Sequence, residues 1–520
     1  MIVCMVLLRS IATVGVFTMI SRLLGFARDI LIAGILGAGP IADAFFVAFK
    51  LPNFFRRLFA EGAFNAAFVP LFVRHLSDGG SAAARQFAQE VMSVLVVALL
   101  FFVTVFQIAM PWIMQGFAPG FINDPIRFDL AVEMTQLTFP YLLFISLVSQ
   151  LGGVLNALGK FAAAAATPII LNLCLIATLL GLSGFVRTPG HALAWGVSIA
   201  GVVQFVWLMI ACSRADFQLR LLRPRLTPRV KRLLILMLPG AIGAGVVQVN
   251  LLIDVVIASL LPHGSISFLY YADRVTQLPL GVIGVAVGTA LLPLLSRQLR
   301  IGEDNGAMGS MNRAIEFALL LTVPAAAALV IIPEGIIAVL FERGEFGTTE
   351  TRATAAALCA YAVGIPGYVL IKVLGPGFFA REDTVTPVKI GAFCILINLG
   401  LNLLLMGSLL HVGIALATAI SAWINAGLLL LVLWRRGHFK ADDRLRRAIP
   451  RVLLASGVMV AVVGFGTEQL TGFAAKDALA RAVALVAVVA IGLIGFAGAA
   501  FVFGATQISD IKDMLDRSSR

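Results

Sequence analysis

The sequence predicts an all-α, polytopic membrane protein, on the strength of its composition, its recurring apolar segments and the charges of its loops. Of its 520 residues, 60% are hydrophobic and 13% are charged, and the mean hydropathy is +1.00. A soluble globular chain is about 45–50% apolar and about 25% charged. The composition therefore excludes an ordinary soluble protein, a disordered chain and a nucleic-acid-binding domain, so we expect no nucleic-acid partner.

Apolar segments long enough to cross a bilayer, about 20 residues each, recur along the whole chain. We expect about fourteen transmembrane helices, at residues 8–36, 41–74, 86–116, 130–157, 162–184, 191–212, 233–261, 266–297, 313–341, 353–379, 386–408, 411–434, 449–470 and 479–505. We expect the first helix to be retained and not cleaved as a signal peptide, because its apolar stretch contains Arg22 and no small-residue cleavage site follows a short core.

Positive charges alternate between the loops, and this alternation predicts the orientation of the chain. Basic residues are concentrated at 214–232 and 435–451, whereas the loops expected outside carry few of them. Because cytoplasmic loops are enriched in Lys and Arg, we expect a multi-pass protein of the inner (plasma) membrane with both termini in the cytoplasm.

Two sets of motifs recur in the same order along the chain, which indicates internal repetition. Residues 41–74 contain Ala-Asp-Ala-Phe-Phe, Lys-Leu-Pro and Val-Pro-Leu, and residues 266–297 contain Tyr-Tyr-Ala-Asp-Arg, Gln-Leu-Pro and Leu-Pro-Leu. A second pair of segments ends in Thr167-Pro168 and Thr386-Pro387. The alternative is coincidence, since such dipeptides also arise by chance in apolar sequence.

The repeat predicts two lobes of six helices each, a common design among transporters that bind their substrate near the bilayer midplane. We expect an N-lobe at 1–215, a C-lobe at 230–437, two further helices at 449–505 and a cytoplasmic tail at 506–520. The last two helices lack charges between 452 and 467 and between 482 and 509. They are either ordinary lipid-facing helices or a groove for a lipid tail.

Ionisable residues inside the expected helices are the most informative part of the sequence, because each costs about 2.5–3.5 kcal/mol at the centre of a membrane helix. The cations are Arg22, Arg28, Lys50, Arg56, Arg57, Arg274 and Lys372. The acids are Asp29, Asp43, Glu61, Asp254 and Asp273. Some of these charges can neutralise each other, as Arg57 and Glu61 could at i,i+4 spacing.

The cations outnumber the acids, which favours a cationic cavity for an anionic substrate over a purely structural network of ion pairs. Arginine predominates, and its planar guanidinium binds phosphate or carboxylate through two parallel hydrogen bonds. We therefore expect a substrate that carries phosphate or carboxylate. Purely structural ion pairing remains the alternative for each residue.

Other kinds of chemistry find little support. The five histidines and five cysteines are dispersed and lack metal-ligand spacing, so we expect no metal and no cofactor. The chain has no glycine-rich phosphate loop ending in Lys-Ser/Thr and no nucleophile-base arrangement. We therefore expect a transporter that breaks no bond, and not an enzyme.

Several motifs resemble those of the MurJ/MviN lipid II flippase family, and the likeness extends from about residue 8 to the end of the chain. The motifs are Ser21-Arg22-Leu-Leu-Gly25-Phe-Ala-Arg28-Asp29, Ala42-Asp43-Ala-Phe-Phe-Val-Ala-Phe-Lys50-Leu-Pro52-Asn53, Arg56-Arg57-Leu-Phe-Ala-Glu61-Gly62, Tyr270-Tyr-Ala-Asp273-Arg274 and Lys372-Val-Leu-Gly-Pro-Gly-Phe.

The resemblance implies the fold of the multidrug/oligosaccharidyl-lipid/polysaccharide exporters and a role in peptidoglycan synthesis, cell wall biogenesis and cell shape. The substrate would be lipid II, an undecaprenyl diphosphate-linked disaccharide peptide, moved from the cytoplasmic to the outer leaflet by alternating access. The resemblance also implies contact with membrane lipids and with the cell-wall synthesis machinery. The substrate-binding set that it implies, together with the buried charges, is Arg22, Arg28, Arg56, Arg274, Asp43, Lys50, Asn53, Arg57, Glu61, Asp273 and Lys372.

Two other functions remain open at this point. An ion-coupled exporter of drugs or of another polyprenyl-linked oligosaccharide could share this fold, although a drug site would favour acids over arginines. A membrane-embedded enzyme acting on lipid-linked sugars would need a large outside loop or an exposed catalytic carboxylate, and the outside loops expected here are short.

Overall fold

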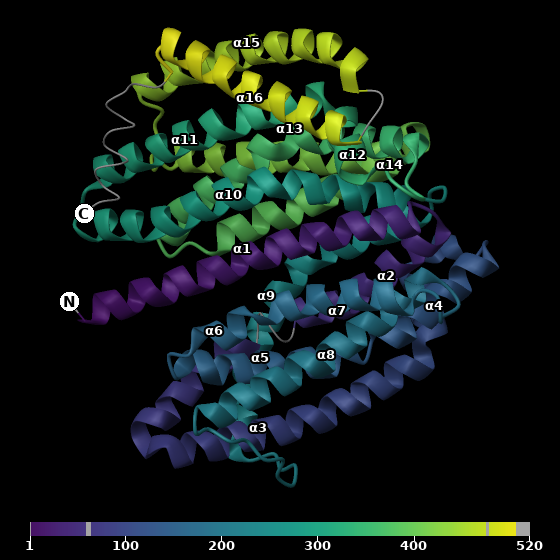
Figure 1. Ribbon diagram of the computed structural model, residues 1–520. Helices are drawn as coiled ribbons and strands as arrows, with labels where there is room; N and C mark the ends of the chain where they lie inside the picture. Colours follow the sequence, from purple (N-terminus) through teal and green to yellow (C-terminus); the bar gives the residue numbers. More distant parts are fainter. Residues whose placement is uncertain (1, 59–63, 475–477, 506–520) are drawn as a thin grey trace. The chain divides into compact units, whose positions relative to one another are not determined.

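The computed structural model describes residues 2–58, 64–474 and 478–505, and within these ranges the chain is helical with no β-sheet (Figure 1). The earlier helices are α1 (Ile2–Leu36), α2 (Pro40–Phe55), α3 (Asn65–Phe117), the short 3₁₀ helix η2 (Pro119–Phe121), α4 (Pro125–Thr138), α5 (Tyr141–Ala157), α6 (Phe161–Ala165), α7 (Thr167–Leu182), α8 (Pro189–Arg214) and α9 (Pro228–Ser259). The later helices are α10 (Ser265–Arg300), α11 (Asp304–Ile331), α12 (Pro333–Phe341), α13 (Thr348–Phe379), α14 (Val385–Arg435), α15 (Asp443–Ala474) and α16 (Ala478–Val502).

The all-α fold class predicted from the composition is confirmed. Among the described residues, nine helical stretches are long and apolar enough to cross a membrane. The expected total of about fourteen crossings stays a prediction. The expected cytoplasmic tail at 506–520 lies outside the described residues.

Two of the longest helices contain a break at the place where the hydropathy pattern predicts a loop. In α3 the backbone of Gly80 has φ 68°, a left-handed conformation that glycine adopts without a steric penalty. In α14 the backbone of Leu410 has φ 51°, between the apolar segments expected to end at 408 and to begin at 411. Each of these long helices is therefore two helical segments joined by a single non-helical residue.

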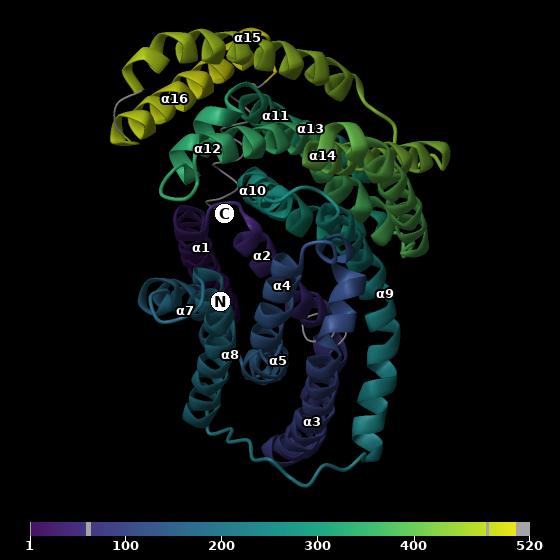
Figure 2. The same cartoon turned by 90° about the vertical axis from the view of Figure 1, so that its right-hand side faces the viewer.

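Packing divides the chain into two compact units. The first comprises residues 1–267 with the short segment 343–346, and the second comprises 268–342 with 347–520. This division lies later in the chain than the lobe boundary expected at 215–230, because α9 packs along α3 (Figure 2). The expected six-helix lobes concern internal repetition and stay a prediction.

The last two helices, α15 and α16, pack against each other and against α11 of the second unit (Figure 1). Val452 and Ala455 of α15 are buried with Ala499 and Ala500 of α16. Gly492 permits this close approach, because a Cβ there would lie only 2.7 Å from a methyl group of Val463. Small residues at such contacts let helices pack tightly within a bilayer.

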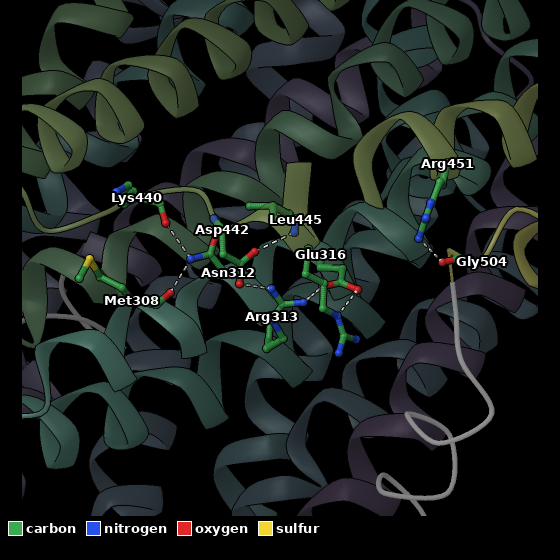
Figure 3. A network of polar contacts seen from close by, with 10 residues as sticks. Met308, Asn312, Arg313, Glu316, Lys440, Asp442, Leu445, Arg451 and Gly504 are labelled. Carbon is green, nitrogen blue, oxygen red and sulfur yellow. Dashed lines mark hydrogen bonds and ion pairs between the residues drawn. The ribbon is translucent and has the colours of Figure 1, made fainter. Parts of the chain in front are cut away.

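A polar network fastens the start of α15 to α11 (Figure 3). The Asn312 side chain donates to the carbonyl of Lys440 at 2.9 Å and accepts from the Asp442 N–H at 3.3 Å. The Asp442 carboxylate pairs with Arg313 and accepts from the Leu445 N–H at 2.7 Å. Glu316 of α11 binds Arg313 and, at 3.2 Å, Arg444. The last two helices are thereby held to α11, within the second unit, by polar contacts as well as by apolar packing.

Candidate functional site

The first unit contains most of the charged residues expected to bind substrate, and they lie on α1, on α2 and directly after α2. Arg22 and Arg28 are on α1, and Asp43, Lys50 and Asn53 are on α2. Arg22 is exposed, whereas Arg28 is only 5% exposed. The two arginines, six residues apart on one helix, therefore occupy very different environments.

Arg28 belongs to a buried network between α1 and α7. Its Nη2 and Nε donate to one carboxylate oxygen of Asp29, at 2.7 and 3.0 Å, and its Nη1 donates to Asn172 Oδ1 at 2.9 Å. The Asn172 amide in turn donates to the Ser21 carbonyl at 3.0 Å. Arg28 thus joins two helices of the first unit.

Asp43 is completely buried and accepts four hydrogen bonds. One carboxylate oxygen accepts from Arg127 Nη2 at 2.7 Å and from the Gly264 N–H at 2.8 Å. The other accepts from the N–H and the hydroxyl of Ser267, at 2.9 and 2.7 Å. A carboxylate at this place satisfies backbone donors that the start of a helix leaves unpaired and favours the positive end of the helix dipole. Asp43 therefore holds the start of α10 at residues 264–267, which still belong to the first unit, whereas the rest of α10 belongs to the second.

The guanidinium of Arg127 is held from a second side by an aromatic ring. Its central carbon lies 3.8 Å from the centre of the Phe121 ring, within the range of a cation–π contact. Arg127 is only 3% exposed. A buried arginine of this kind requires both the acid and the ring to offset the cost of removing its charge from water.

The second half of α2 and the residues that follow it carry the remaining expected residues of this unit. Asn53 donates to the Phe49 carbonyl at 2.7 Å and accepts from Arg56 Nε at 3.0 Å. Lys50 and Arg56 are half-buried, and Arg57 is exposed. Glu61 lies outside the described residues. The end of α2 is therefore a basic segment in which Asn53 orients Arg56.

In the second unit, α10 and α13 carry the other expected residues. Arg274 Nη2 donates to the Tyr270 hydroxyl at 2.9 Å, and its guanidinium lies 4.9 Å from the centre of the Tyr270 ring. Asp273 accepts from Gln277 Nε2 at 2.6 Å. Both residues are half-buried, and Lys372 on α13 is exposed.

The expected residues thus fall into separate groups within each unit, and four of their partners had not been singled out as site residues. Arg127 was not identified from the sequence, because its charge alone does not indicate a partner 84 residues away in the chain. A lone Asn or Ser in an apolar segment is the signal that could have identified Asn172 and Ser267. Tyr270 stands in the quoted motif, one helical turn before Arg274.

The described residues contain no group of three or more His, Cys, Asp or Glu side chains placed to hold a metal ion. The arginine, lysine and amide side chains at these sites bind anions and hydrogen-bonding groups through their N–H donors.

The chain matches known proteins over most of its length. The family model "Lipid II flippase MurJ" matches residues 32–503. A "Probable lipid II flippase MurJ" of Rhizobium meliloti (strain 1021) is 47% identical over 470 residues, which covers 90% of this chain and 88% of the relative. A "Lipid II flippase MurJ" of Burkholderia cenocepacia is 35% identical over 461 residues, covering 88% and 89% of the two chains.

Solved structures agree with the sequence matches. The structure "Lipid II flippase MurJ, inward closed conformation" has a TM-score of 0.78 and 26% identity, and covers 94% of this chain and 98% of that one. A multidrug resistance MATE transporter, inward-facing, has a TM-score of 0.68 at 15% identity and covers 82% and 98%, which shows a common fold alone. The resemblance noted from the motifs is thus confirmed: this multi-pass helical membrane protein belongs to the lipid II flippase MurJ family.

Proposed function

We propose that this protein moves lipid II from the cytoplasmic to the outer leaflet of the inner membrane for peptidoglycan synthesis. The observation that carries the proposal is the 47% identity to a probable lipid II flippase over 90% of the chain. Transport of this kind breaks no bond, so the protein acts as a carrier and not as an enzyme.

The arrangement of charges supports an anionic substrate. The buried acids Asp29 and Asp43 are each bound by an arginine of their own unit, Arg28 and Arg127. Their charge is therefore used inside the first unit. A substrate diphosphate is bound by the basic residues of α1, α2 and the segment that follows α2, because arginine binds phosphate through directed pairs of hydrogen bonds.

The expected site residues take two roles in this proposal. Those that contact the head group are Arg22, Lys50, Asn53, Arg56 and Arg57 in the first unit and Asp273, Arg274 and Lys372 in the second. Arg28 and Asp43 position their helices, because direct contact with substrate would compete with the hydrogen bonds that they already make. Glu61 lies outside the described residues, and its contact with the head group stays a prediction from the sequence.

The polyprenyl tail stays in lipid beside α15 and α16. Large apolar side chains on both helices are exposed, among them Leu453, Leu454, Leu493 and Ile494. Apolar surface of this kind is stable only against lipid tails or another apolar chain. The network around Asn312 and Asp442 keeps this helix pair attached to the second unit while the carrier works.

The proposed orientation has both termini and the basic loops at 215–227 and 436–442 in the cytoplasm, following the asymmetry of Lys and Arg. The direction of transport fits the charge of the substrate, since moving one negative charge out of a negative-inside cell is favoured by ~2.3 kcal/mol per 100 mV. The protein would hand its substrate to the cell-wall synthesis machinery at the outer surface.

The direct test uses bacterial cells depleted of their own lipid II flippase. We expect this chain, supplied from a plasmid, to restore the exposure of lipid II at the outer leaflet, measured with a membrane-impermeant enzyme or label that modifies lipid II. Normal membrane levels of the chain without restored exposure would contradict the proposed function.

A further inference from the structure

The connection between α8 and α9, residues 215–227, is an extended segment of the first unit that packs against α3 (Figure 2). An aromatic contact and an arginine fix its start. Phe217 is only 2% exposed, and its ring meets the Phe72 ring edge-on with the centroids 5.5 Å apart. Arg85 of α3 donates to the Asp216 carbonyl at 2.7 Å, and its guanidinium lies 5.3 Å from the centre of the Phe217 ring. The connection therefore leaves α8 along a defined path.

Two side chains of α3 hold the rest of the connection. Ser93 Oγ accepts from the Leu222 N–H at 2.8 Å and donates to the Gln89 carbonyl at 2.8 Å. Glu90 accepts from the Thr227 hydroxyl at 2.8 Å. Because these contacts fix both the middle and the end of the segment, its exposed side chains are held in a preformed arrangement.

The same contacts place the connection at the edge of the apolar part of α3. Residues 91–117 of α3 contain no charged side chain. Val97 lies about 6 Å beyond Ser93, at a rise of 1.5 Å per residue, and is already 50% exposed. The preceding helix, α8, is long and apolar enough to cross a membrane and ends at Arg214. The connection therefore lies where the head groups of a bilayer begin.

Positive charge is concentrated on the connection and on the first turn of α9. Residues 214–232 contain one acid, Asp216, and seven exposed cations: Arg214, Arg220, Arg223, Arg225, Arg229, Lys231 and Arg232. Within the described part of the chain, none of the seven makes a side-chain hydrogen bond or an ion pair. Arginine binds phosphate through directed pairs of hydrogen bonds, so this surface is suited to phosphate groups.

The basic segment of the second unit, residues 435–451, provides a contrast, because part of its charge is used within the protein. Arg436 pairs with Asp383 at 2.6 Å. Arg444 pairs with Glu316 at 3.2 Å. The cations around the α8–α9 connection have no such partners among the described residues and remain available to a ligand.

Exposed leucines alternate with the arginines of the connection. Leu221, Leu222 and Leu226 are 64%, 42% and 60% exposed, on either side of Arg223 and Arg225. Apolar side chains are unfavourable in water but are stable at the boundary between head groups and acyl chains, where interfacial segments bury them beside basic residues. A nucleic acid or an acidic protein would satisfy the arginines alone. The combination of both side-chain types favours a phospholipid.

We propose that the α8–α9 connection binds anionic phospholipid, with its arginines on the phosphate groups and its leucines against the upper part of the acyl chains. These residues are separate from those assigned to the lipid II head group, so the inference goes beyond the proposed function. Binding here would anchor the adjoining ends of α8 and α9 at the bilayer surface.

Three variants of the full-length protein isolate this surface. The connection variant replaces three arginines with Gln: Arg220, Arg223 and Arg225. The control variant removes the same charge from the second unit, at exposed arginines that make no side-chain hydrogen bond or ion pair with the described residues: Arg435, Arg446 and Arg447. The leucine variant, Leu221→Gln with Leu226→Gln, retains every charge and removes the apolar part of the surface.

The experiment titrates each purified protein with phosphatidylglycerol or with neutral phosphatidylcholine and measures bound lipid by native mass spectrometry. We expect the unaltered protein and the control variant to bind phosphatidylglycerol alike, and more tightly than phosphatidylcholine. The connection variant should bind phosphatidylglycerol at least about tenfold more weakly, since each basic residue near an anionic surface contributes a factor of about five. The leucine variant should also bind it more weakly. If thermal unfolding shows that the connection variant is poorly folded, the leucine variant decides the question.

The proposal would be overturned by equal binding of the two lipids, by equal weakening in the connection and control variants, or by binding that the arginine or the leucine replacements leave unchanged. Glycerophosphoglycerol, the same head group without acyl chains, should bind weakly, and binding as tight as that of the lipid would assign the surface to a soluble phosphate. Displacement of the lipid by a short polyglutamate peptide would assign it to an acidic protein.

Lipid II exposure in cells distinguishes phospholipid from the transported lipid. We expect the connection variant to expose lipid II at a near-normal level. Loss of exposure at normal membrane levels of the variant would mean that the connection takes up lipid II, and would overturn its assignment to phospholipid.

Discussion

Asp43 and Asp273 occupy matching places in the predicted repeat, yet the structure gives them different surroundings. Asp43 is completely buried, with Arg127, Gly264 and Ser267 all donating to its carboxylate. Asp273 is half-buried and accepts from Gln277, one turn further along its own helix. Motif position therefore predicts where a charge lies on a helix, whereas contacts made by distant segments decide whether it has a structural role.

The same contrast separates Arg28 from Arg22 on α1. Arg28 is buried and makes hydrogen bonds to Asp29 and Asn172, whereas Arg22 is exposed. A buried pair is costly to break because the remaining charge stays in an apolar environment. An exposed arginine costs little to remove from the fold and remains available to a ligand.

The largest effect is expected from Asp43→Ala, which leaves the buried charge of Arg127 without its carboxylate. Breaking a buried ion pair from one side costs about 3–5 kcal/mol, so we expect a large fall in thermal stability in detergent. Asp273→Ala should cost less than about 1 kcal/mol, as for a partly exposed acid. Equal losses for the two variants would contradict the distinction between the two acids.

Arg28→Ala should come next in size. It breaks a buried ion pair with Asp29 and a hydrogen bond to Asn172. Because three hydrogen bonds are lost here and four are lost at Asp43, we expect a loss at the lower end of the range for a buried pair, about 3 kcal/mol. Arg22→Ala should change stability by about 0.5 kcal/mol or less and yet reduce transport. Thermal unfolding and lipid II exposure are measured on both variants. If Arg22 were structural and Arg28 bound substrate, Arg22→Ala would lower the unfolding temperature, and Arg28→Ala would reduce lipid II exposure without lowering that temperature.

Arg274 allows the second unit to be tested in the same way. Its guanidinium is oriented by the hydroxyl and the ring of Tyr270. We expect Arg274→Ala to abolish transport in a folded protein, and Arg274→Lys to retain part of it, because lysine keeps the charge but loses the planar fork. Transport by Arg274→Lys equal to that of the unaltered protein would show that the planar guanidinium has no role beyond its charge.

The smallest effect is expected at the attachment of α15, and it depends on pH. Burial raises the pKa of Asp442, but the hydrogen bond from the Leu445 N–H and the guanidinium of Arg313 lower it by more. The pKa of Asp442 therefore lies below its ordinary value of 3.8. Because the folded state favours the charged form, this stabilisation is present above the ordinary pKa and is lost as the pH falls through the lowered value. Asp442→Asn should therefore lose stability at neutral pH, within about 1 kcal/mol for a partly exposed pair.

The adjacent exposed Asp443 supplies the control for that measurement. Thermal unfolding of Asp443→Asn between neutral and acid pH should follow the unaltered protein, whereas Asp442→Asn should show a weaker dependence on pH. A pH dependence unchanged by Asp442→Asn would mean that the carboxylate does not support the attachment of α15.

The sequence predicts the helical part of this architecture well, because the physical signals for it are local. A run of apolar residues predicts a membrane helix, and the ends expected near 75–86 and 408–411 coincide with the breaks at Gly80 and Leu410. The family also follows from the motifs, since these are long and contain uncommon residues.

The partners of the charged residues were not predicted, because they depend on contacts between distant segments. Arg127 lies 84 residues from Asp43, and Asn172 lies 144 residues from Arg28. No local periodicity connects such pairs.

The central claim is that exposed and half-buried cations bind the anionic head group, and one measurement tests it most directly. It compares lipid II exposure at the outer leaflet for a triple variant with Arg22, Arg56 and Arg274 replaced by Ala and for a control with Arg223, Arg225 and Arg447 replaced by Ala. The control arginines are exposed residues of the basic segments around α9 and α15. At equal membrane levels, we expect the control to expose lipid II normally and the triple variant to expose almost none. Near-normal exposure by the triple variant would contradict the account and assign these arginines to the fold alone.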